Sequence, residues 1–155
     1  MAKASDHIQL ANRNQEALAF LLEADSRFPE WVTTVAFYKA VHVVEAVFVA
    51  NDLDASTEHK DRLRKLKADR RFEKIYEHFR PLFNASLIAR YLIDPEGKSK
   101  TYRTFSDYLP ADKVSAEMVR HRLHQVEESA VKFLGADGRR LTRAVPPPAP
   151  PGPRA

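Results

Sequence analysis

The sequence predicts an all-α domain, a four- to five-helix up-and-down bundle followed by a disordered tail rich in proline and arginine. Three observations indicate this fold class. Apolar residues recur at helical spacing over several long stretches, only 4 of the 155 residues are glycine, and six of the 10 prolines lie in residues 138–155. We expect the helical domain to cover residues 1–137, because the tail holds too little apolar area to fold.

The first two helices are predicted over about residues 6–25 and 29–51. Asp6 and Gln9 have the spacing of a capping box, and Pro29 suits a first helical turn. Lys39 and Glu45 would make a membrane span by the very apolar second helix costly, so it is expected to be the buried centre of the bundle. The inner face of the first helix would be formed by Leu10, Ala17, Leu18, Leu21 and Leu22.

Three more helices complete the predicted bundle. A short charged helix over about residues 57–68, capped by Ser56, would turn Leu63 and Leu66 inward. The next apolar stretch, about residues 70–93, contains Pro81, which predicts a kink or a split. A polar loop over residues 94–114 precedes a last helix over residues 115–134, which Gly135 would end. That last helix would bury Val119, Leu123, Val126, Ala130 and Phe133, and the loop carries Tyr102, Phe105 and Tyr108.

Charge is distributed unevenly along the chain. The tail holds four arginines and no acid, so residues 1–137 balance 21 basic against 21 acidic residues. Within them, residues 1–57 hold eight acids and four bases, whereas residues 58–80 hold nine bases and five acids. This basic surface could hold a phosphate backbone, but it could equally be a solvated helix or meet the acidic half of a partner chain.

Composition also bounds the compartment and the chemistry. The chain has no cysteine, which excludes disulfides, Cys-ligated zinc and thiol catalysis and fits a reducing cytoplasm. No apolar run follows a basic start at the N-terminus, so we expect no signal peptide, and the charged residues of the second helix lead us to expect no membrane association. Glycine-rich phosphate loops, zinc-protease motifs and nucleophile elbows do not occur in the sequence.

Polar residues in unusual places are the remaining candidates for a site. Lys39, His42 and Glu45 follow one another in steps of three along the second helix, which would place them on one edge. A histidine beside a carboxylate can act as an oriented general base or contact phosphate. The alternative interpretation is that this edge is simply the solvated side of a buried helix.

Two further groups have similar alternatives. His59, Lys60 and Arg62 would lie where the third helix begins, a position that favours anions, although His59 could be an ordinary surface residue. Arg90 falls on an apolar face, where it could snorkel outward, pair with Glu45 or present its guanidinium in a pocket. Arg71 and His78 would share a helix face, which by itself is a weak signal. Tyr91 follows Arg90 directly.

The stretches Trp31–His42 and Glu58–Arg62, together with Ala89-Arg90-Tyr91, resemble small stand-alone bacterial HEPN-domain proteins over about residues 6–95. The resemblance implies a four- or five-helix bundle that forms a homodimer, while the absence of cysteine favours a cytoplasmic location. Many members are metal-independent endoribonucleases and act as toxins beside a nucleotidyltransferase-type antitoxin, whereas others are catalytically silent. The resemblance therefore implies that the ligand is RNA or a nucleotide and that no cofactor is needed. The alternative is a non-catalytic helical module that binds nucleotides or protein.

The resemblance also implies roles for individual residues. The family's motif is an arginine followed, after four to six residues, by a histidine, and Arg71 and His78 fit that count with Phe72 in place of the usual polar residue. His42 or His59 would activate a ribose 2′-hydroxyl, and Arg90 or Arg62 would hold the phosphate. The predicted catalytic residues are thus His42, His59 and Arg90, and the predicted binding residues are Lys39, Glu45, Lys60, Arg62, Arg71, His78 and Tyr91, with no metal.

Overall fold

The computed structural model describes residues 2–23, 28–91 and 112–147 of the chain. Five α-helices lie within these ranges, and the described residues contain no strand, which confirms the all-α class. Three short 3-10 turns supplement the helices: η1 (Arg70–Phe72), η3 (Val131–Phe133) and η4 (Gly135–Arg139). The helices are α1 (Ala4–Glu23), α2 (Pro29–Ala50), α3 (His59–Ala68), α4 (Glu73–Tyr91) and α6 (Asp112–Ala130).

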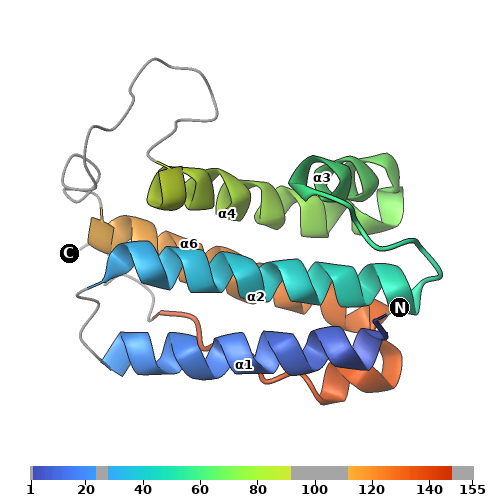
Figure 1. Cartoon of the computed structure of the whole chain (residues 1–155), viewed down its shortest axis with the longest axis horizontal. Coiled ribbons are helices and arrows are strands. Elements are labelled where there is room, and N and C mark those ends of the chain that lie inside the picture. The colour runs from blue at the N-terminus through green and yellow to red at the C-terminus, as the bar shows by residue number, and fades with distance from the viewer. Residues whose placement is uncertain (1, 24–27, 92–111, 148–155) are drawn as a thin grey trace, which may run out of the picture.

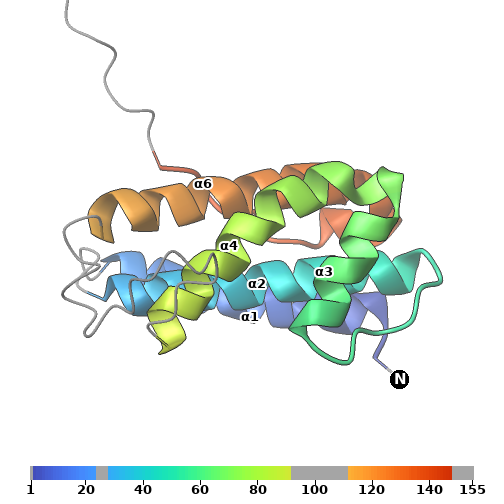
Figure 2. The same cartoon turned by 90° about the horizontal axis from the view of Figure 1, so that it is seen from above.

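Helix α2 is the centre of the bundle. Figure 1 shows α1, α4 and α6 running lengthwise around it, with the short α3 at one end, and Figure 2 shows α4 crossing α2 obliquely. By length and composition α2 could span a membrane, but most of it is buried inside the bundle. Its side chains are apolar nearly all round because it packs against helices on several sides. The fully buried ones include Val32, Ala36, Phe37, Ala40, Val43, Val44, Val47 and Phe48.

Helix α1 begins two residues earlier than predicted, because its capping carboxylate occupies the third helical position. The Asp6 side chain accepts a hydrogen bond of 2.7 Å from the Lys3 amide, which lies just before the helix. Its buried face agrees with the expected one at Leu18 but not at Leu10, which is 47% exposed, and it includes the buried Ile8 in addition. The small Ala11 is fully buried as well, as suits a close approach to α2.

Helices α3 and α4 meet at a tight corner. The Asp69 carboxylate accepts a hydrogen bond of 2.9 Å from the Arg71 amide, which starts the turn η1. Helix α4 then continues through Pro81 as one helix, so the predicted split does not occur. After α6, Gly135 adopts a φ of +59°, the left-handed conformation that glycine tolerates and that ends a helix. The predicted loop aromatics Tyr102, Phe105 and Tyr108 lie outside the described residues.

The prediction that disorder begins at residue 138 is wrong for residues 138–147. Leu141 and Ala144 are each only 5% exposed. The Arg140 carbonyl accepts a hydrogen bond of 2.8 Å from Asn12 of α1, which fixes the segment to the bundle. Composition alone did not reveal this packing, because the bonds that hold the segment come from side chains far away in the sequence. Residues 148–155 lie outside the described residues.

A buried ion pair connects α2 to α6. Lys39 and Glu127 form a salt bridge in which both side chains are completely buried. The Lys39 ammonium also donates to Gln15 Oε1 at 2.6 Å and to the Thr142 carbonyl at 2.7 Å. Burial lowers the pKa of Lys39, and the neighbouring Glu127 opposes that shift. Lys39 therefore helps to hold the fold together, and the alternative interpretation of a solvated edge is wrong for this residue, whereas its role in ligand binding stays a prediction.

We predict that Lys39→Met lowers the free energy of unfolding by about 3–5 kcal/mol, because Glu127 would stay buried without its main partner. Urea denaturation followed by circular dichroism measures this loss. Arg13→Ala is the matched control, since its pair with Glu16 leaves the two side chains 80% and 71% exposed and should contribute little. A loss for Lys39→Met no larger than that of the control would contradict the structural role.

Candidate functional site

The candidate site is built around a second buried ion pair, between α2 and α3. Arg62 Nε donates to Glu45 Oε1 at 2.8 Å, and the two side chains are 9% and 6% exposed. The other Glu45 oxygen accepts a bond of 3.1 Å from the Ser56 amide, just before α3. Ser56 therefore orders the approach to α3 through its backbone, and the predicted side-chain cap is not formed. Glu45 pairs with Arg62 and not with Arg90.

His59 receives its orientation from the same arginine. Arg62 Nη1 lies 2.8 Å from His59 Nδ1. A guanidinium can only donate, so Nδ1 must carry a lone pair and the ring proton sits on Nε2. The ring packs against Phe37 and Phe83, with centroid distances of 5.3 and 5.8 Å. Burial, followed by the charges of Arg62 and Arg90, lowers the pKa of His59. His59 is thus held as a neutral Nε2–H donor, an arrangement that suits binding better than proton abstraction.

His42 has a partner that sequence reasoning missed. Its Nδ1 lies 3.2 Å from Nδ1 of His7 on α1, so one ring must donate and the other must accept. The donating ring keeps a free lone pair on Nε2, the atom that could act as a base. Burial is the main cause that lowers the pKa of both histidines. The signal for His7 was its place one turn before Ala11 and next to Ile8 on the buried face of α1.

Arg90 lies in a half-buried aromatic setting near the end of α4. Its guanidinium carbon is 5.1 Å from the centre of the Phe37 ring and 5.5 Å from that of Tyr38. It also lies 4.9 Å from the ring centre of Tyr91. Nη1 donates to the Tyr38 hydroxyl at 3.1 Å, and Nη2 donates to Ser86 Oγ at 3.2 Å. Within residues 2–23, 28–91 and 112–147, no carboxylate forms a salt bridge with Arg90.

These two groups of side chains meet at Phe37, whose ring contacts both His59 and Arg90. The charges of Arg62 and Arg90 have different partners. Glu45 neutralises Arg62, whereas the Arg90 charge is met only by neutral oxygens and aromatic faces in the described part of the chain. A half-buried cation with neutral donors around it is a setting that attracts an anion.

Three predicted binding residues lie elsewhere. Lys60 is exposed on α3. The Arg71 side chain bonds the Asp69 carboxylate at 2.8 Å, and His78 lies 2.9 Å from Nη1 of Arg122 on α6. Arg71 and His78 are thus engaged with different partners, and Arg71 lies in the turn η1, before the α-helix that carries His78 begins. In the described residues there is no group of three or more potential metal ligands.

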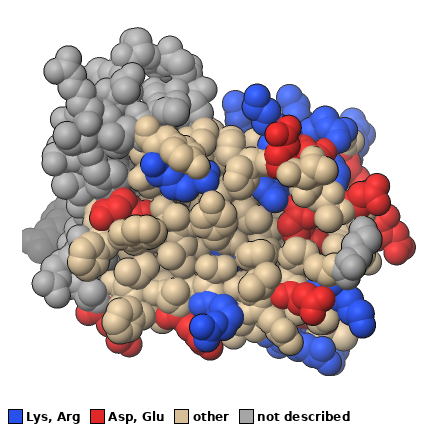
Figure 3. All heavy atoms as spheres, viewed as in Figure 1, with Lys and Arg blue, Asp and Glu red and all other residues tan. Residues whose placement is uncertain are grey.

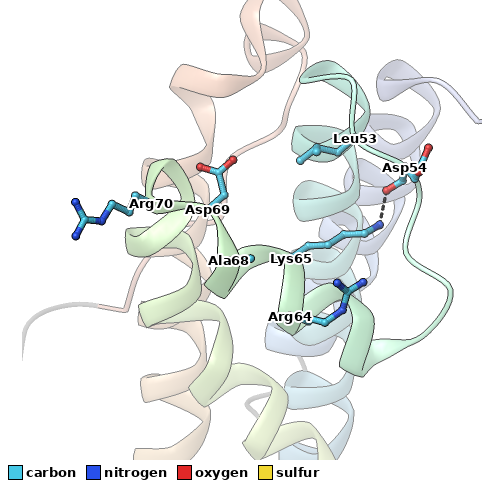
Figure 4. Close-up of a pocket in the computed structure, with 7 residues that line it drawn as sticks. All are labelled: Leu53, Asp54, Arg64, Lys65, Ala68, Asp69 and Arg70. Atoms are coloured by element: carbon cyan, nitrogen blue, oxygen red, sulfur yellow. Dashed lines mark hydrogen bonds between the residues drawn. The ribbon is translucent and has the colours of Figure 1, made fainter.

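The basic block of residues 58–80 does form a surface at α3, seen as the blue region at the upper right of Figure 3. A pocket of about 440 Å³ opens beside it. The cations that line the pocket largely have partners already. Arg64 and Lys65 both pair with Asp61, and Lys65 also bonds the Asp54 carbonyl. Arg70 points away from the pocket in Figure 4. The pocket is lined by Leu53, Asp54, Arg64, Lys65, Ala68, Asp69 and Arg70.

Comparisons of the chain with protein-family models, curated proteins and solved structures give no match. The resemblance to HEPN-domain proteins therefore stays a prediction from the sequence.

We predict that the free energy of unfolding falls when the pH is lowered from about 7.5 to about 5.5. Burial lowers the pKa of His7 and His42 below 6.5, so the unfolded chain takes up these protons at a higher pH than the folded chain. The stability that these two histidines contribute is fully present above pH 6.5. It is lost as the pH falls from there toward their lowered pKa values in the folded state. Urea titrations at both pH values measure the loss.

The variant carrying His7→Gln and His42→Gln should lose less stability on acidification, because two of the titrating groups are gone. His59 and His78 also have lowered pKa values, so some loss should persist in the variant. Identical losses in the variant and the parent protein would show that this pair does not titrate as the structure requires.

Proposed function

We propose that this protein binds RNA or a nucleotide through a phosphate group held at Arg90, as a non-catalytic binding protein. The observation that supports this most is the half-buried Arg90 guanidinium, surrounded by three aromatic rings and neutral oxygens, with no salt bridge to a carboxylate in the described residues. A cation held this way has its charge largely uncompensated and is available for an anion.

The chemistry of the surrounding groups favours phosphate as that anion. A planar guanidinium matches two phosphate oxygens at once. The Tyr38 hydroxyl accepts from Arg90 and keeps its own proton to donate, and the His59 ring, which also packs against Phe37, offers its Nε2–H as a further donor. Tyr91 is 58% exposed and offers a ring face on which a base can stack. Phosphate and base together make a nucleotide unit the best-fitting ligand.

A metal-independent endoribonuclease is the second candidate, and the His7–His42 pair favours it. The ring that donates Nδ1–H has a free Nε2 lone pair, which could take the proton of a ribose 2′-hydroxyl. That oxygen would then attack the adjacent phosphorus, and the 5′-oxygen of the next nucleotide would leave. In this scheme Arg90 would stabilise the charge that develops on the phosphate. The homodimer, the nucleotidyltransferase-type antitoxin partner and the toxin role stay predictions from the resemblance, and the cytoplasmic location stays a prediction from the composition.

We predict that Arg90→Ala weakens binding of a short single-stranded RNA about 10- to 100-fold, because hydrogen bonds to a charged group are lost. Fluorescence anisotropy with a labelled oligonucleotide, in EDTA and about 0.15 M salt, measures the affinity. Arg80→Ala is the matched control, since Arg80 is exposed on the same helix. An equal weakening by both substitutions would mean that binding depends on general positive charge and would contradict the site.

The same samples distinguish the two candidates when the RNA is run on a denaturing gel. Intact RNA at saturating protein supports the binding function. Cleavage that disappears in both His7→Ala and His42→Ala, while Arg80→Ala still cleaves, would support the endoribonuclease instead.

A further inference from the structure

Residues 140–147 leave the turn η4 and run along the bundle without forming a helix or strand, with their backbone held by side chains. Figure 1 shows this segment running beside α1 after the last turns of the chain. Asn12 of α1 holds it at two points. The Asn12 side-chain nitrogen donates to the Arg140 carbonyl at 2.8 Å, and the Asn12 side-chain oxygen accepts from the Thr142 amide at 2.7 Å. A single amide side chain thus binds both a donor and an acceptor of the segment.

Helices α2 and α6 bind the next backbone groups. Lys39 donates to the Thr142 carbonyl at 2.7 Å, and Glu127 Oε2 accepts from the Ala144 amide at 2.8 Å. His124 and Arg120 of α6 lie 3.3 Å from the carbonyls of Ala144 and Val145, respectively. The groove formed by α1, α2 and α6 therefore contacts the segment largely through its peptide groups.

Burial along the segment repeats every third residue. Leu141, Ala144 and Pro147 are buried, whereas Thr142 and Val145 between them are exposed. A β-strand would alternate every second residue, and a period of three is that of a polyproline II helix. Pro146 and Pro147 favour the same conformation, because the ring fixes φ near the polyproline II value and Val145 precedes a proline.

One side chain of the segment adds selectivity. Arg143 lies with its Nε 3.5 Å from Glu127 Oε2, and its Nη2 pairs with Glu128. Two acids of α6 thus receive an arginine that stands between the buried Leu141 and Ala144. The groove fits an extended segment with a small or aliphatic residue at every third position and an arginine between the first two of them.

We propose that the groove between α1, α2 and α6 is a binding site for a proline-rich segment in the polyproline II conformation. The chain fills it with its own residues 140–147. The groove contacts the peptide groups of the segment and three of its spaced side chains. None of these contacts requires that the segment be joined covalently to the bundle through η4. Groove and segment therefore behave as receptor and ligand within one chain.

The test separates the segment from the bundle after folding. A recognition site for a specific protease is inserted between Arg139 and Arg140, both of which are exposed, and the folded full chain is cut there. We expect the released segment to elute with the bundle in size-exclusion chromatography. A labelled synthetic peptide of residues 140–155 should then exchange into the groove, with binding followed by fluorescence anisotropy.

Two variants and a second peptide make the result specific. Asn12→Ala should weaken peptide binding about 30-fold, because two hydrogen bonds are lost together. Asn14→Ala is the matched control, since its side chain bonds only the Leu10 carbonyl within α1. A peptide with Leu141→Asp and Ala144→Asp should not bind. The proposal is overturned if the bundle unfolds on cutting, if the labelled peptide fails to bind, or if the altered peptide binds equally well.

Discussion

The buried pair between Glu45 and Arg62 is the interaction on which the candidate site depends. Helix α3 is densely charged, and little apolar surface attaches it to the bundle, so this pair fixes its position against α2. The same arginine holds the ring of His59 in one tautomer. That ring lies against Phe37, which also contacts Arg90. One desolvated carboxylate thus determines the arrangement of side chains from three helices.

Burying such a pair is costly, and the cost is acceptable only where every charge has good partners. Both acids concerned meet this condition, because Glu45 also accepts from the Ser56 amide and Glu127 also accepts from the Ala144 amide. In each case the second oxygen organises a segment outside the helices. The Glu45 pair orders the approach to α3, and the Lys39–Glu127 pair secures the C-terminal segment. Helix α2 therefore carries two buried charges with different partners: Glu45 pairs with α3, and Lys39 pairs with α6.

The amphipathic patterns predicted the all-α class, the central place of α2 and the last helix's buried face. They could not predict where the charges of α2 would point. Residues six positions apart lie about 120° from each other around a helix axis. Lys39 and Glu45 therefore meet different neighbours, although each is close to His42. The sequence likewise could not show that Asn12 and Glu127 satisfy the backbone of a tail whose composition is typical of disorder. Partners that are distant along the chain decide both outcomes.

The candidate site requires that Arg62 hold His59 as a neutral Nε2–H donor beside the uncompensated Arg90. Nitrogen chemical shifts of the histidine rings, recorded by NMR across the pH range from about 5 to 8, test it most directly. We predict that His59 shows the Nε2-protonated neutral tautomer and titrates below 6.5, since burial and two nearby arginines oppose its charged form. An Nδ1-protonated ring, or titration above 6.5, would show that Arg62 does not hold His59 in this way.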